Sequence, residues 1–182
     1  MLDEFIDVVR EIYGDGFVPL HRPIFSEREK NSVARVIDSN FVSSAGKEIE
    51  IFEREIADFT GASYAIATVN GTAALHVSLI LAGVSAGTEV ITQAVSFVAT
   101  ANAISYCHAK PVFIDIERDT MAMSAEALAT FLQANVEMRQ GQAYNKTTGA
   151  RIGACVPMHS FGHPVRIDEI ADICAAYNIA LV

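Results

Sequence analysis

Short apolar runs alternate with helix-like segments along the chain from residue 60 onward. The runs are about as long as buried strands, and apolar residues between them recur at helical spacing. This alternation is typical of a parallel sheet covered by helices. The sequence therefore predicts an α/β fold with a mostly parallel sheet. The predicted strands cover residues 64–69, 89–92, 111–115, 152–158 and 179–182.

Capping residues indicate where the helices of this part begin and end. Gly83 follows the helix that starts near Gly71, and glycine suits the left-handed position after a helix. Ser124 precedes an apolar stripe at helical spacing and predicts an N-cap. Two further helices are predicted over about 97–106 and 167–177.

The first 60 residues show helical periodicity without strand-like runs. Ser26 and Glu29 have the spacing of a capping box, and Gly61 follows a second apolar stripe. We therefore predict an N-terminal helical segment over residues 1–60 and an α/β domain over residues 61–182. The polar segment 136–151 interrupts this domain and predicts a surface excursion.

The end of the chain also carries a prediction. Residues 180–182, Ala-Leu-Val, stop inside an apolar run, whereas the sites of α/β sheets form just beyond the carboxyl ends of strands. We expect the chain to be a fragment that is truncated at the C-terminal end of its α/β domain.

Composition and charge exclude several classes of protein. Of the 182 residues, 51% are apolar and 19% are charged, which excludes a disordered chain. Thirteen Lys and Arg against 22 Asp and Glu give a net charge of −9, which argues against nucleic acid and anionic membranes as partners. Cys107, Cys155 and Cys174 form no CxxC pair. They favour free thiols in a reducing compartment, and we predict a cytoplasmic protein.

The motif VNGTAAL places Gly71 and Thr72 at a predicted junction of strand and helix. Backbone N–H groups and the helix dipole at such a junction favour an anion, best a phosphate. Gly71 lets a ligand approach the backbone, and the Thr72 hydroxyl adds a hydrogen-bond donor. The alternative is that Asn70 or Thr72 only caps the helix. Neither GxGxxG nor GxxxxGK[ST] occurs, which argues against dinucleotides and nucleoside triphosphates.

Phe97 and His159 follow other predicted strands at the same edge of the sheet. The ring of Phe97 would lie flat against an aromatic ligand whose phosphate sits at Thr72, although a single Phe is more often a core residue. His159 is either a polar wall of the pocket or a hydrogen-bonded structural histidine. His159 and His163 have no carboxylate or Cys to complete a ligand set, so no metal site is predicted.

Two long segments resemble the DegT/DnrJ/EryC1/StrS family of pyridoxal-phosphate-dependent sugar aminotransferases, which have fold type I. They are NGTAALHVSLILAGVSAGTEVITQAVSFVATANAISYCHAKPVFIDIERDT and ACVPMHSFGHPVRIDEIADICAAYNIALV. The resemblance runs from about residue 21 to residue 182. The segments HRPIF and NFVSSAGKEIEIFE are most similar to the branch that aminates nucleotide-linked 4-keto-6-deoxy sugars on the way to legionaminic acid.

The resemblance implies the fold of the large domain, the cofactor and the partners. Pyridoxal 5′-phosphate is the implied cofactor, a nucleotide-sugar the substrate and glutamate the amino donor. Members of the family resembling this chain are homodimers with pockets shared between subunits. The implied parent protein is therefore a homodimeric aminotransferase.

The resemblance also implies roles for individual residues. Thr72 and Ala73, after Gly71, would hold the cofactor phosphate, Phe97 would stack on the pyridine ring, and His159 would lie near the pocket floor. Ser43 and Ser44, in the NFVSSAG loop, would approach the substrate or the neighbouring subunit.

The resemblance places the chemically reactive residues elsewhere. In the family, the Schiff-base lysine and the aspartate that pairs with the pyridine nitrogen come later than the segment matched here. Both would lie beyond Val182, so the chain holds no catalytic residue and is expected to be inactive alone.

Two other functions stay open at this point. Some relatives carry histidine in place of the lysine and remove a sugar hydroxyl, so a pyridoxal-phosphate-dependent sugar dehydratase of the same fold is one alternative. A phosphate-ligand-binding module without catalysis is the other.

Overall fold

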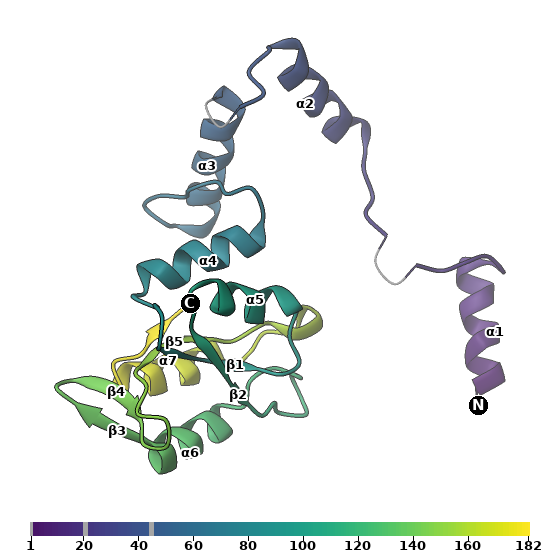
Figure 1. Ribbon diagram of the computed structural model, residues 1–182. Helices are drawn as coiled ribbons and strands as arrows, with labels where there is room; N and C mark the ends of the chain where they lie inside the picture. Colours follow the sequence, from purple (N-terminus) through teal and green to yellow (C-terminus); the bar gives the residue numbers. More distant parts are fainter. Residues whose placement is uncertain (1, 20–21, 44–45) are drawn as a thin grey trace. The chain divides into compact units, whose positions relative to one another are not determined.

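The computed structural model describes residues 2–19, 22–43 and 46–182 (Figure 1). The chain divides into two compact units, residues 1–67 and residues 68–182. The first unit contains helices, and the second contains the sheet. The division predicted from the sequence, 1–60 and 61–182, stays a prediction.

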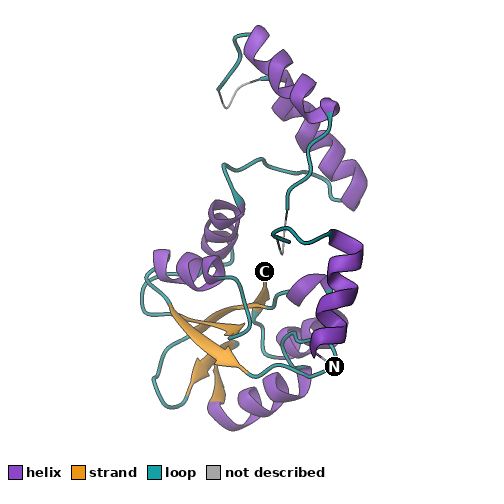
Figure 2. Cartoon of the chain, turned by 90° about the vertical axis from the view of Figure 1, so that its right-hand side faces the viewer, coloured by secondary structure: helices purple, strands orange, loops and turns teal. Residues whose placement is uncertain are grey.

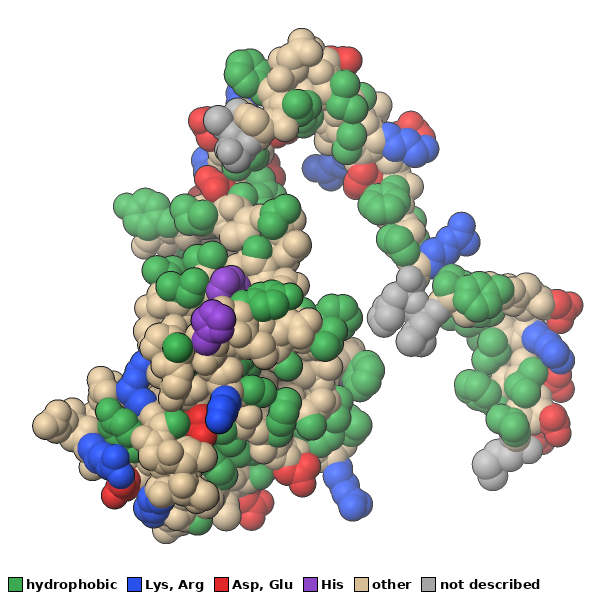
Figure 3. Space-filling view, in the orientation of Figure 1, with side chains coloured by type: hydrophobic (Ala, Val, Ile, Leu, Met, Phe, Trp, Pro, Cys, Tyr) green, Lys and Arg blue, Asp and Glu red, His purple; other side chains and the backbone are tan. Residues whose placement is uncertain are grey.

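The described residues of the first unit form α1 (Leu2–Tyr13), α2 (Glu27–Asp38) and α3 (Lys47–Thr60). Acidic side chains gather on one side of α1 and apolar side chains on the other (Figure 3). The capping box before α2 is confirmed, because the Ser26 N–H donates to Glu29 Oε2 over 2.6 Å and the Ser26 side chain accepts from the first turn. Gly61, with φ +74°, ends α3.

The second unit alternates helices and strands as the hydrophobic pattern predicts. Its elements are α4 (Gly71–Leu81), β1 (Glu89–Gln93), α5 (Val98–Tyr106), β2 (Lys110–Ile114), α6 (Ala125–Asn135), β3 (Val136–Arg139), β4 (Gln142–Asn145), β5 (Ile152–Val156), the 3-10 turn η1 (Ser160–Gly162), α7 (Ile167–Ala176) and β6 (Ala180–Leu181). The main sheet has the order β2-β1-β5-β6, and all of its strands are parallel.

Helices cover both faces of this sheet (Figures 1 and 2). Adjacent residues of a strand point to opposite faces, so Val90 packs with Leu79 and Ile104 of α4 and α5, whereas Ile91 packs with Leu128 of α6. The α/β prediction with a parallel sheet and flanking helices is confirmed. The predicted caps at Ser124 and Gly83 are also present: the Ser124 hydroxyl accepts from the Ala127 N–H, and Gly83 has φ +80°.

Residues 64–69, which the apolar run predicts as a strand, do not form one. A strand needs a neighbour to take its backbone hydrogen bonds, and in the described part of the chain no strand pairs with this segment. The Tyr64 side chain is 87% exposed, and Ile66 and Val69 are similarly exposed. The prediction was wrong because an apolar run indicates only that side chains favour burial, whereas a strand also requires a neighbouring strand for its backbone hydrogen bonds.

The segment 136–151 is also more ordered than a surface excursion. β3 and β4 pair in an antiparallel hairpin, with Val136 opposite Asn145. The Asn145 amide donates to the buried Glu89 carboxylate of β1 over 2.8 Å, which ties the hairpin to the main sheet. The polar composition of the segment therefore reflects a half-exposed ribbon.

Candidate functional site

The carboxyl ends of β1 and β5 meet at one edge of the main sheet, where α4 and α5 also begin. A cavity of about 450 Å³ opens there. In α/β folds, ligands bind at this edge, because the loops that follow parallel strands gather there. The cavity is lined by Gly71, Thr72, Leu75, Phe97, Ala99, Thr100, Val156, Pro157, Met158 and Val182.

The start of α4 forms one wall of the cavity. Asn70 is the N-cap, and its side-chain oxygen accepts from the Ala73 N–H over 2.9 Å. Gly71 and Thr72 lie in the first turn of the helix, where a backbone N–H has no carbonyl four residues earlier in the helix to accept its hydrogen bond. A Cβ on Gly71 would meet no atom within 4 Å, so the backbone is open to an approaching group. Asn70 therefore caps the helix through Ala73, which leaves the N–H groups of Gly71 and Thr72 without an intrahelical acceptor.

Phe97 forms a second wall of the same cavity. It is the N-cap residue of α5, and its side chain is 71% exposed, so it is not a core residue. Its backbone N–H donates to Met158 Sδ over 3.4 Å, and the Ser96 hydroxyl contacts the same sulfur. Phe97 and Thr72, which are 25 positions apart in the sequence, thus line one cavity.

His159 has a different environment from the one expected of a pocket wall. Its Nδ1 accepts from the Val165 N–H over 3.0 Å, and the residue is exposed. It is not among the described residues that line the cavity, and neither is Ala73. The geometry supports the interpretation of His159 as a hydrogen-bonded structural histidine that shapes the loop after β5. Among the described residues, no group of three or more His, Cys, Asp or Glu is arranged to hold a metal ion.

Two residues of this edge were missed by the sequence analysis. Met158 lines the cavity, and Gln93, the last residue of β1, is fully buried behind it. A signal for Gln93 was present in the sequence, because a polar amide side chain directly follows the predicted strand 89–92. Met158 had no comparable signal, since methionine at the end of an apolar run reads as core.

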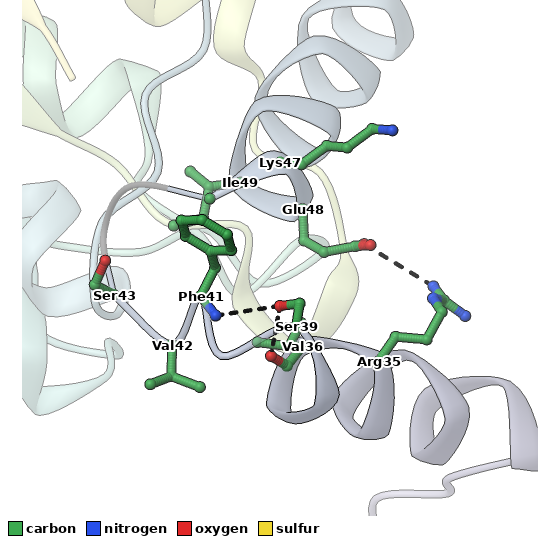
Figure 4. Close-up of a pocket in the computed structure, with 10 residues that line it drawn as sticks. Arg35, Val36, Ser39, Phe41, Val42, Ser43, Lys47, Glu48 and Ile49 are labelled. Atoms are coloured by element: carbon green, nitrogen blue, oxygen red, sulfur yellow. Dashed lines mark hydrogen bonds and ion pairs between the residues drawn. The ribbon is translucent and has the colours of Figure 1, made fainter.

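Ser43 belongs to another cavity, within the first unit (Figure 4). This cavity measures about 520 Å³ and lies between the end of α2 and the start of α3. The Ser39 hydroxyl donates to the Val36 carbonyl and accepts from the Phe41 N–H, which shapes the loop. Ser43 lines this cavity of the first unit, and Ser44 lies outside the described residues, so their predicted role stays a prediction.

Comparison with known proteins shows the family of the chain. The sequence pattern of the DegT/DnrJ/EryC1/StrS aminotransferase family matches residues 23–182. The chain belongs to this family. Its members depend on pyridoxal phosphate.

Individual relatives agree in sequence and in fold. The chain is 31% identical over 166 residues to GDP-perosamine synthase of Escherichia coli O157:H7, covering 91% of the chain and 41% of that protein. It superposes on an aminotransferase structure from Psychrobacter cryohalolentis with TM-score 0.73 and 30% identity, covering 91% of the chain and 38% of that protein. A Bacillus subtilis structure, NtdA with bound PMP, shares the fold with TM-score 0.73 at 23% identity, covering 91% and 35% respectively. The chain therefore spans about two fifths of the length of these relatives.

Proposed function

We propose that this chain forms the cofactor-binding part of an aminotransferase that moves an amino group from glutamate to a nucleotide-linked 4-keto-6-deoxy sugar. The observation that carries the proposal is that Gly71, Thr72 and Phe97 line one cavity at the carboxyl edge of a parallel sheet. The family and the similarity to a GDP-perosamine synthase support the choice of reaction and of a nucleotide-linked substrate.

The residues at the start of α4 fit the phosphate of pyridoxal phosphate. The Gly71 and Thr72 N–H groups lie at the positive end of the helix dipole, which favours a doubly charged anion. The Thr72 hydroxyl adds one donor. The volume of about 450 Å³ lies in the range of small-molecule sites. In the proposal these residues bind the phosphate and thereby fix one end of the cofactor.

Phe97 fits the pyridine ring, at the end of the cofactor away from the phosphate. Its exposed ring offers an apolar face to a planar heterocycle, and stacking of this kind contributes about 0.5–1.5 kcal/mol. Leu75, Val156 and Pro157 complete a largely apolar lining that would keep water from the ring. When bound, the cofactor supplies an electron sink for chemistry at the carbon that carries the amino group.

The lysine and the acidic partner of the ring would come from residues after Val182 in a longer protein. Lys110 begins β2, at the end of the sheet opposite to the cavity, and Lys146 donates through its ammonium to the Ala134 carbonyl. Neither is placed to reach the cofactor. The greater length of the relatives supports this part of the proposal.

The proposal extends to assembly and location. We infer a homodimer, as the family resemblance implies. We also infer a cytoplasmic enzyme, which fits the three buried Cys residues, none of which is in a disulfide. Among the described helices, none is long and apolar enough to cross a membrane. Ser43 and Ser44 are proposed to approach the substrate or the neighbouring subunit.

Titration of the chain with pyridoxal phosphate tests the binding site. Saturable binding that inorganic phosphate competes is expected, and Phe97→Ala should weaken it by about three- to tenfold. Phe17→Ala, which removes an exposed ring from the first unit, is the matched control and should bind as the wild type does. Binding that is indifferent to both Phe97→Ala and inorganic phosphate would place the cofactor elsewhere.

An activity assay tests the missing residues. The 182-residue chain, supplied with pyridoxal phosphate, glutamate and a nucleotide-linked 4-keto sugar, is expected to form no amino sugar. Turnover by this chain alone would show that it contains its own catalytic lysine and would overturn that part of the proposal.

A further inference from the structure

We propose that Gln93 is the positioning residue of this site: its side-chain amide fixes Met158, and Met158 determines where Phe97 stands in the cavity. The inference rests on the proposed function for the identity of the ligand. The contacts that carry it are independent of that function, because they lie within the chain itself.

The Gln93 side chain uses its full hydrogen-bonding capacity. Its Oε1 accepts from the Met123 N–H over 2.8 Å and from the Met158 N–H over 3.0 Å. Its Nε2 donates to the Val95 carbonyl over 2.8 Å and to the Ser160 hydroxyl over 2.9 Å. A carboxamide offers two donor hydrogens and two acceptor lone pairs, so none is left over.

These four partners belong to three different loops. Val95 follows β1, Met123 lies after β2, and Met158 and Ser160 follow β5. Each loop leaves the carboxyl edge of the sheet, where the cavity lies. A fully buried side chain that connects all three loops fixes their separations, because losing any of these bonds leaves a buried polar group unpaired.

The connection continues from Met158 to Phe97. The Met158 sulfur accepts from the Phe97 N–H over 3.4 Å and is contacted by the Ser96 hydroxyl at 3.6 Å. Met158 itself lines the cavity beside Phe97. Gln93 holds the Met158 backbone, and the Met158 side chain holds the backbone of the residue that carries the exposed ring. Among the described residues, no hydrogen bond joins Gln93 to the start of α4. The proposed phosphate position therefore does not depend on the contacts from Gln93 through Met158 to Phe97.

Because Gln93 is joined to Phe97 but not to the phosphate position, a substitution at Gln93 should affect the two ends of the site differently. Gln93→Met keeps the length and nearly the volume of the side chain but removes all four hydrogen bonds. Gln133→Met, on an exposed position of α6, is the matched control. Affinity is measured with two probes, pyridoxal phosphate and inorganic phosphate. Gln93→Met should weaken pyridoxal phosphate by about three- to tenfold, while inorganic phosphate binds as in the wild type.

A second readout needs no ligand. Amide hydrogen exchange of the unliganded chain should be faster in Gln93→Met at Phe97 and Met158, whereas the Leu79 amide in α4 should keep its wild-type rate. A general loss of stability would instead accelerate exchange throughout the second unit. Equal weakening of both probes, or unchanged exchange at Phe97, would overturn the proposal.

Met158→Leu keeps the proposal testable if Gln93→Met does not fold. It removes only the sulfur acceptor, and it should reproduce the selective loss of pyridoxal phosphate affinity and the faster exchange at Phe97. Failure of the wild-type chain to bind pyridoxal phosphate would count against the proposed function, and the exchange measurement would still decide the role of Gln93.

Discussion

The side chain of Asn70 accepts a hydrogen bond from the N–H of Ala73, 2.9 Å away, and closes the first turn of α4. This bond uses the N–H of Ala73, which the resemblance assigns, with Thr72, to the phosphate. The N–H groups of Gly71 and Thr72 stay outside the cap. A phosphate at this helix would therefore be held by the first two residues of α4, with Asn70 fixing the helix end that presents them.

Replacing Asn70 with alanine should lower the free energy of unfolding by about 1 kcal/mol, because the N-cap bond is lost. Chemical denaturation monitored by circular dichroism measures the change. Asn70→Asp retains an acceptor oxygen at the same place and should stay close to the wild type. An alanine variant of wild-type stability would show that the cap bond contributes little here.

Removing the Thr72 hydroxyl should weaken the binding of pyridoxal phosphate by about 10- to 150-fold, since hydrogen bonds to charged groups contribute about 1.5–3 kcal/mol. Thr72→Val keeps the shape of the side chain, and isothermal titration calorimetry gives the affinity. Thr72→Ser should restore most of the binding, and Thr130→Val on the exposed side of α6 should change nothing. Equal affinities for Thr72→Val and the wild type would remove the hydroxyl from the site.

Truncating Leu128 to alanine should destabilise the second unit by about 2–5 kcal/mol, because the side chain is fully buried between α6 and the sheet. The unfolding midpoint in urea reports the loss. Thr130→Ala, two positions along the same helix but exposed, should remain within about 0.5 kcal/mol of the wild type. Similar effects of the two substitutions would contradict the packing described for α6.

The ion pair of Asp119 and Arg166 should make stability depend on pH in the acid range. The Arg166 guanidinium, 2.7 Å from Asp119 Oδ2, lowers the pKa of that carboxyl, chiefly through the hydrogen bond between them. A lowered pKa in the folded state contributes stability above the ordinary aspartate pKa, and this contribution is lost as the pH falls through the lowered value. Arg166 also pairs with Glu117 and Glu169.

The unfolding temperatures of the wild type and Arg166→Met, compared from neutral to acid pH, measure this effect. The difference between them should be constant near neutrality and shrink below the ordinary pKa of aspartate. Arg54→Met on α3 should give no such trend. A difference that grows as the pH falls would contradict the assignment. High salt should reduce the difference as well, because the pair is exposed.

The sequence predicted those elements well that depend on interactions between residues close to one another in the chain. A cap depends on a side chain and an N–H two or three positions away, so Ser26 and Ser124 marked helix starts correctly. Apolar runs likewise placed β1 and β5, because burial on both faces of the sheet imposes its own composition. The same reasoning failed for residues 64–69, whose strand character would depend on a partner that the described chain does not provide.

The candidate site was only half accessible to sequence reasoning. Gly71, Thr72 and Phe97 were predicted to share a site because each follows a predicted strand, and parallel strands end at one edge. The structure places all three in one cavity, although residues 64–69 form no strand. His159 follows the same logic, yet its imidazole turns to the Val165 N–H and does not line the cavity. The direction of the His159 side chain depends on its hydrogen-bond partner, and the conformation of the loop after β5 determines which partner lies within reach.

The amino-acid sequence by itself determined the fold class, the helix caps and the candidate phosphate position of this protein, because those depend on periodicity and on neighbours a few residues away. Tertiary structure alone decided that Phe97 stands exposed beside α4, that Met158 supports it, and that Gln93 connects three loops behind them. These relationships join residues that are up to 67 positions apart in the sequence. They arise only when parallel strands bring their carboxyl ends together and a buried amide must satisfy every one of its hydrogen bonds.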